Sequence, residues 1–142
     1  QKKDAQALRA LADYLRSNET QPIIAPWWQC PALAYWSGQP TVAGSSHESM
    51  PGIVDTARFY VTTDYEEADK IVRAHDVQWV IAFDPNEVLQ NSSMLLNEQA
   101  VPGKSMGSIL YYGWHSAPPF LEVMTYNQYF KVFRVQPEED AR

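Results

Sequence analysis

The run VQWVIAFD, residues 77–84, constrains the fold more than any other part of the chain. It is dense in β-branched and aromatic residues, which makes it the clearest strand in the sequence. The segment before it, TTDYEEADKIVRAHD (residues 62–76), has the apolar spacing of an amphipathic helix, with Thr63 or Asp64 as its N-cap. A helix that leads into a strand is the usual rhythm of an α/β sheet.

The rest of the chain also contains predicted helices followed by short predicted strands. Residues 2–18 are expected to form an amphipathic helix, and PIIAPW (residues 22–27) a short, fully buried strand. The remaining predicted elements are helices at residues 30–38, 52–62 and within 106–120, a short strand at 40–45, a helical or irregular crossover at 85–105, and two strands in 121–137 around a turn at Asn127-Gln128.

These elements predict an α/β fold. Its sheet is expected to be mixed and mainly parallel, with short strands covered by helices and a C-terminal antiparallel hairpin. Hydrophobic residues make up 45% of the 142 residues and charged residues 20%, so we expect residues 1–142 to form a single globular domain.

The ends of the first two predicted strands carry the candidate site. Ligands bind open α/β sheets at the carboxyl ends of their strands, and these two strands are neighbours along the chain. We therefore expect their polar and aromatic side chains to share one rim. The candidate residues are Trp27, Trp28, Gln29, Ser45, Ser46, His47 and Glu48.

The residues themselves leave the chemistry of this rim open. His47 and Glu48 can act as an acid/base pair, or they can satisfy backbone groups in an exposed loop. A hydrolase that uses Cys30 or Ser46 with His47 is one hypothesis, although a lone cysteine is usually a small buried hydrophobe. We predict no metal site and no cofactor in this chain, because its histidines are dispersed and no phosphate-binding glycine motif is present.

Two further observations bear on ligands. The net charge is −6 and no run of Lys or Arg occurs, so nucleic acid is not an expected partner. Exposed tryptophans at 27, 28 and 36 would suit a non-catalytic carbohydrate- or ligand-binding module. Tyr111, Tyr112 and Trp114 can form a sugar-stacking platform, but packing of the last helix onto the sheet is the favoured interpretation.

The order of the pieces from Pro22 to Phe83 resembles one known family. IIAPWWQCPALAYWSGQPTVAGSSHES followed by GIVDTARFYVTTDYEEADKIVRAHDVQWVIAF is similar to the soluble C-terminal part of oligosaccharyltransferase catalytic subunits and related GT-C membrane glycosyltransferases. In that family a strand runs into a WWDYG motif. Here Trp27 and Trp28 match it, and Gln29, Cys30 and Pro31 stand in place of Asp, Tyr and Gly.

The resemblance implies a function that composition alone does not. It implies an extracytoplasmic C-terminal domain of a longer polytopic membrane protein, inactive alone, whose partners are its own upstream transmembrane region, a lipid-linked sugar donor and an acceptor glycan or peptide. The family's divalent metal would be bound by acidic residues of the membrane half. Its motif holds the hydroxyl residue of the acceptor through hydrogen bonds that include the Asp. With Gln29 at that position, a different acceptor or a structural role for the two Trp fits as well.

Overall fold

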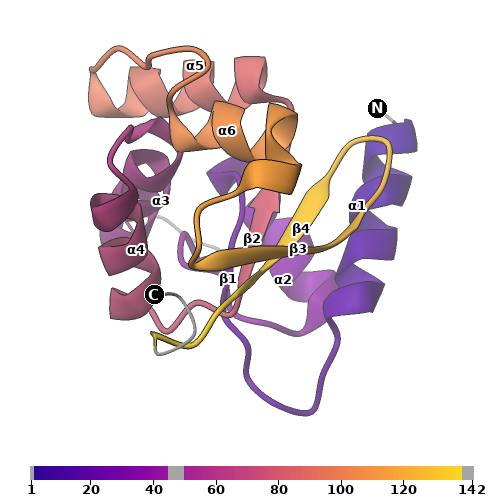
Figure 1. The fold of residues 1–142 in the computed structure, drawn as a ribbon. Coiled ribbons are helices and arrows are strands. Elements are labelled where there is room, and N and C mark those ends of the chain that lie inside the picture. The colour runs from indigo at the N-terminus through magenta and orange to yellow at the C-terminus, as the bar shows by residue number, and fades with distance from the viewer. Residues whose placement is uncertain (1, 45–49, 139–142) are drawn as a thin grey trace.

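The computed structural model describes residues 2–44 and 50–138, and Figure 1 shows helices around a small sheet. The elements in chain order are α1 (Lys2–Leu15), β1 (Ile23–Ile24), η1 (Trp27–Gln29), α2 (Cys30–Ser37), α3 (Met50–Val61), α4 (Tyr65–Ala74), β2 (Trp79–Ala82), α5 (Pro85–Leu96), α6 (Met106–Tyr112), η3 (Trp114–Ser116), β3 (Leu121–Tyr126) and β4 (Lys131–Val135). The predicted α/β class is confirmed.

The sheet has the strand order β1-β2-β4-β3. β1 pairs with β2 in parallel, whereas β4 pairs with both β2 and β3 antiparallel. The sheet is therefore mixed, and the expectation of a mainly parallel sheet was wrong. The predicted strand at 40–45 is reduced to one parallel bridge between Thr41 and Ile23. Pairing stops there because the chain turns immediately, with Gly44 at a positive φ of 72°.

Local sequence signals explain where the helices begin and end. Asp64 caps α4 by accepting a hydrogen bond from the backbone N–H of Glu66 at 2.9 Å, as predicted. Gly38 ends α2 in the left-handed conformation, with φ at 73°. The apolar stripe of α1 is buried at Leu8, Leu11, Ala12 and Leu15.

The core gathers on both faces of β2, all four residues of which are buried. In Figure 1, α1 and α2 lie on one side of the sheet, α3 and α4 on the other, and α5 and α6 across one end. The Tyr60 hydroxyl of α3 donates to the carbonyl oxygen of Ile81 at 2.5 Å, which ties that helix to the central strand. Gly52 brings the start of α3 against the backbone of Val42, where no side chain would fit.

The C-terminal hairpin predicted from Asn127 is confirmed. The Asn127 side-chain oxygen accepts hydrogen bonds at 2.9 Å from the backbone N–H groups of Tyr129 and Phe130, which holds the turn between β3 and β4. The register shifts between Val123 and Thr125, so β3 is bent at the outer edge of the sheet.

Candidate functional site

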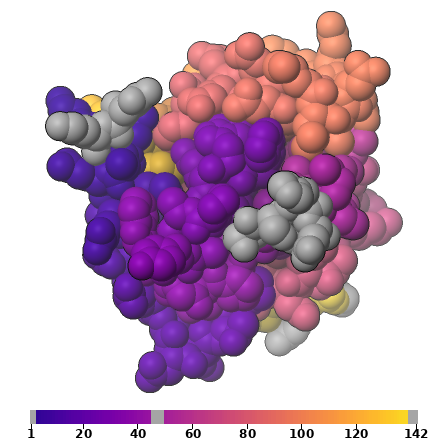
Figure 2. All heavy atoms as spheres, turned by 180° about the vertical axis from the view of Figure 1, so that it is seen from behind, coloured from indigo at the N-terminus to yellow at the C-terminus, as the bar shows by residue number. Residues whose placement is uncertain are grey.

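The double tryptophan stands where β1 ends. Pro26 has an extended backbone, and its carbonyl oxygen accepts a hydrogen bond at 2.9 Å from the N–H of Gln29, which closes the turn η1. α2 begins at the next residue, with Pro31 in its first turn. Trp27, Trp28 and Gln29 therefore come from one short turn at the carboxyl end of β1. Figure 2 shows the purple stretch of the chain, which includes η1 and α2, at the surface of the molecule.

Trp27 and Trp28 are half-buried and pack against the core. Their rings meet edge to face, with centroids 5.6 Å apart and planes at 88°. This geometry is the one that aromatic pairs prefer, so the two rings fix each other's orientation. They form a rigid, partly accessible surface rather than two freely exposed rings.

Two polar atoms of this turn are unsatisfied. The indole Nε1 of Trp27 and the side-chain Oε1 of Gln29 are shielded from water and have no hydrogen-bond partner among the described residues. An unmade hydrogen bond of a buried group costs about 1–3 kcal/mol. Each buried polar group without a partner calls for an explanation, such as a bound water or ligand, and α4 and α5 carry three more of them, at Arg73, Ser92 and Ser93. Among the candidate residues that the sequence pointed to, the turn is the part that carries such groups.

Cys30 follows the turn but is no nucleophile. The residue is fully buried, and its Sγ donates weakly to the carbonyl oxygens of Ala25 and Pro26 at 3.6 Å. Burial raises the pKa of the thiol from its ordinary value of 9.0 to about 11, so the reactive thiolate is scarce at neutral pH. The interpretation of Cys30 as a small core residue is confirmed.

Trp36 is separate from the double tryptophan. It lies on α2, and the guanidinium of Arg9 from α1 stands 5.3 Å from its ring centroid. One ring face is thus occupied by a cation from the neighbouring helix, which favours a role in packing α1 against α2 over stacking on a ligand.

Ser45, Ser46, His47 and Glu48 lie outside the described residues. The segment before them pairs with β1, because Val42 donates to the carbonyl oxygen of Ile23 at 2.9 Å. The helix after them, α3, contacts η1. No three His, Cys, Asp or Glu side chains come together as metal ligands in the described part of the chain.

The fold of this chain is similar to that of known solved structures. Neither a protein-family model nor a curated protein matches the sequence. Over 92% of the chain, the fold matches 95% of the C-terminal globular domain of an oligosaccharyltransferase from Archaeoglobus fulgidus, with a TM-score of 0.69 and 17% identity. A second structure of such a domain from the same organism gives a TM-score of 0.56 at 16% identity and covers 95% of this chain and 94% of that one.

The chain has the fold of an oligosaccharyltransferase C-terminal globular domain. The resemblance predicted from the order of its sequence motifs is confirmed at the level of the fold. Within residues 2–44 and 50–138, none of the helices combines the length and the apolar character needed to cross a membrane.

A second surface of this fold was not predicted from the sequence. A groove lies between α5 and α6, and it was hidden in a stretch assigned as a helical or irregular crossover. The available signal was the amide side chains of Asn86, Gln90 and Asn97, which recur at helical spacing and so share one side of α5.

Proposed function

We propose that this chain is the acceptor-positioning domain of a membrane-embedded, oligosaccharyltransferase-like glycosyltransferase. The observation that carries the proposal is the Trp27-Trp28-Gln29 turn at the carboxyl end of β1, within a fold shared with oligosaccharyltransferase domains. The sequence places this turn where the resembling family has its acceptor motif. The domain would hold the acceptor, and a membrane half would carry out the sugar transfer.

Gln29 is the residue that would recognise the acceptor. Among the described residues, its Oε1 has no hydrogen-bond donor and the neighbouring Trp27 Nε1 has no acceptor. A hydroxyl group can satisfy both needs, because it donates one hydrogen bond and accepts others. The groups that cover these two atoms must move for that contact to form, so we expect acceptor binding to be accompanied by local rearrangement.

The remaining partners follow from the same proposal. The sugar would come from a polyprenyl-phosphate-linked donor, and the domain would stand on the extracytoplasmic face, attached to its own upstream transmembrane region. Cys30, the remaining nucleophile candidate of the described rim, is buried as a thiol. A buried thiol argues against nucleophilic chemistry at Cys30, and this supports the proposed positioning role.

The test uses the full-length gene product in membrane vesicles. It is supplied with a polyprenyl-phosphate-linked sugar, and transfer is measured against the concentration of two acceptors, an Asn-x-Thr peptide and a free oligosaccharide. Gln29→Ala should raise the KM for the acceptor about tenfold, the effect of losing about 1.4 kcal/mol of binding, with kcat nearly unchanged. Trp28→Ala should act in the same direction.

Trp36→Phe is the matched control. It changes a tryptophan of the next helix whose ring face is already covered by Arg9, so the acceptor KM should stay the same. Absence of transfer to both acceptors, or a Gln29→Ala variant with unaltered acceptor KM, would overturn the proposal. So would a gene with no hydrophobic spans upstream of Gln1.

A further inference from the structure

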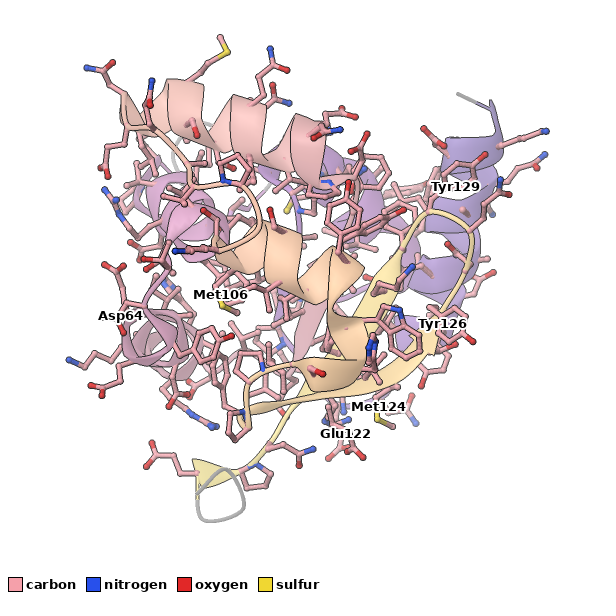
Figure 3. The ribbon with its side chains drawn as sticks, turned by 45° about the horizontal axis from the view of Figure 1, so that its top comes forward. Asp64, Met106, Glu122, Met124, Tyr126 and Tyr129 are labelled. Carbon is pink, nitrogen blue, oxygen red and sulfur yellow. The ribbon has the colours of Figure 1, made fainter. Side chains whose placement is uncertain are left out.

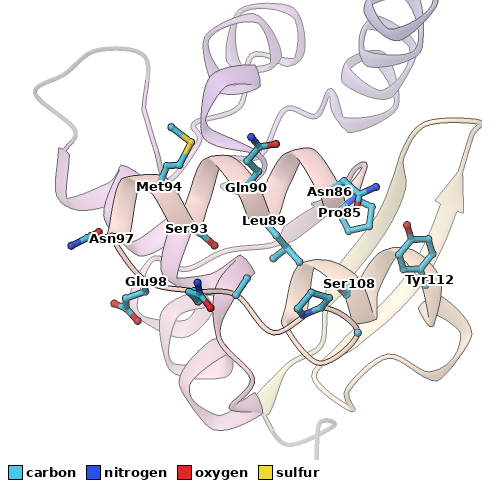
Figure 4. Close-up of a pocket in the computed structure, with 14 residues that line it drawn as sticks. Pro85, Asn86, Leu89, Gln90, Ser93, Met94, Asn97, Glu98, Ser108 and Tyr112 are labelled. Carbon is cyan, nitrogen blue, oxygen red and sulfur yellow. The ribbon is translucent and has the colours of Figure 1, made fainter.

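A groove of about 670 Å³ runs along α5, facing residues 97–103 and α6. Its volume lies within the roughly 300–1,000 Å³ typical of small-molecule sites. Figure 4 shows Leu89 and Ser93 pointing from α5 toward the opposite wall, with Glu98 near one end and Tyr112 at the other. From Asn86 to Asn97 the helix rises about 16 Å, so the groove is long as well as open.

The chemistry of the groove is neutral. Among the described residues that line it, Glu98 alone is charged, and the Arg58 guanidinium neutralises it through two hydrogen bonds of 2.7 and 2.5 Å. Planar amides are the main polar groups, over an apolar floor that includes Leu89. These amides belong to Asn86, Gln90, Asn97 and Gln99. In a chain of net charge −6, a neutral groove favours an uncharged ligand with many hydroxyl groups.

Aromatic rings continue this surface beyond the groove. Tyr112, 64% exposed, meets Tyr111 edge to face at 5.4 Å. The Lys131 ammonium stands 4.6 Å from the Tyr111 ring centroid and 5.7 Å from that of Tyr126, which is 59% exposed. Trp114 lies 5.1 Å from Tyr126. Figure 3 shows Tyr126 on the hairpin, near the end of β3.

We propose that the α5–α6 groove and the aromatic rings beside it bind a neutral oligosaccharide. A pyranose ring has hydroxyl groups around its rim and apolar C–H faces. Amides can hydrogen-bond the rim, and the exposed rings of Tyr112 and Tyr126 can stack on the faces, because tyrosine pairs an apolar face with a polar tip. An extended peptide is the competing occupant, but none of the described residues that line the groove belongs to a sheet edge on which a peptide backbone could pair.

This site goes beyond the acceptor turn and does not depend on it. η1 follows β1, whereas the groove is lined by α5, residues 97–103 and α6, and none of the described residues belongs to both. The proposed acceptor site and the proposed glycan site therefore share no residue. The two proposals can fail independently.

The test titrates the 15N-labelled 142-residue chain with maltotriose, mannotriose and triacetylchitotriose, followed by NMR. At least one trisaccharide should shift amide signals of α5, residues 97–103, α6 and the β3–β4 hairpin in a saturable way. Tyr112→Ala and Gln90→Ala should each weaken that binding about tenfold, equivalent to about 1.4 kcal/mol. Both residues are exposed, so both variants should keep the thermal midpoint of the unaltered chain.

Two control variants sharpen the test. Tyr35→Ala removes a tyrosine of α2 that is 83% exposed and does not line the groove, and Trp28→Ala removes a ring of the acceptor turn. Both should bind the trisaccharide as the unaltered chain does. The proposal is wrong if no trisaccharide causes saturable shifts at about 10 mM, where a site of about 1 mM is mostly filled. Shifts centred on η1, or shifts with a neutral peptide alone, would also overturn it.

Discussion

Gln39 holds together a part of the fold that has little secondary structure. The side chain is only 3% exposed. Its Oε1 accepts a hydrogen bond at 2.7 Å from the backbone N–H of Gln21, and its Nε2 donates to the carbonyl oxygens of Leu15 and Glu19 at 3.3 and 3.1 Å. One amide thus fixes the end of α1 and the loop that leads into the two-residue strand β1.

Gln39→Ala should therefore lower the free energy of unfolding by about 3 kcal/mol, since three hydrogen bonds contribute about 1 kcal/mol each. Gln39→Glu should cost more, because a carboxylate cannot donate to the carbonyl groups of Leu15 and Glu19 and would be buried as a charge. Urea denaturation followed by circular dichroism measures both changes. With a slope of about 1–3 kcal/mol per M, the midpoint for Gln39→Ala should fall by about 1–3 M.

Gln6→Ala is the control, because Gln6 is an exposed residue of α1 and its loss should change stability by no more than about 0.5 kcal/mol. If Gln39→Ala were as mild as this control, the hydrogen bonds of the buried amide would contribute nothing net. The ordering of the two Gln39 variants is a second check. A Gln39→Glu chain as stable as the unaltered one would refute the assignment of Nε2 as a donor to two carbonyl groups.

Three further predictions concern the core. Gly52→Ala should lower the free energy of unfolding by about 1–3 kcal/mol, seen as a lower thermal midpoint, because its Cβ would meet the Val42 carbonyl oxygen. Tyr60→Phe should cost about 1–2 kcal/mol in urea titrations, because it leaves the buried Ile81 carbonyl without its donor. Burial raises the pKa of Cys30 from 9.0 to about 11, so the unfolded chain loses the thiol proton first as pH rises. Stability should fall by about 2–3 kcal/mol between pH 9 and 11, and Cys30→Ala should lack that part of the loss.

The helices could be predicted from the sequence because their signals are local. The apolar stripe of α1, the Asp64 cap of α4 and the Gly38 stop of α2 depend on residues a few positions apart, so the sequence contains them directly. The β3–β4 hairpin was predictable for the same reason, since Asn127 satisfies backbone groups two and three residues away. The resemblance to oligosaccharyltransferase domains rested on the order of such local pieces.

The strand order and the contacts of the buried polar groups could not be predicted from such local signals. β4 enters the sheet between β2 and β3, which makes most of the pairing antiparallel, and this depends on contacts between residues far apart in the chain. Gln39 fell between a predicted helix and a predicted strand, and its hydrogen-bond partners lie 18 to 24 positions away. The groove beside α5 needs α6 as its second wall. Of the rim, the sequence identified the Trp27–Gln29 turn, but not that its polar atoms are unsatisfied.

The placement of α5 fixes the separation between the two proposed sites. β1 and β2 are parallel neighbours, so η1 and α5, which follow them directly, begin at the same end of the sheet. Asp84 caps α5 through the N–H of Asn86 at 3.0 Å, and Val88 and Ser92 are buried on its inner side. A helix anchored in this way cannot slide without exposing that core. An oligosaccharide in the groove and an acceptor at the double tryptophan would therefore be held at a constant separation, at the end of the domain where the parallel strands finish.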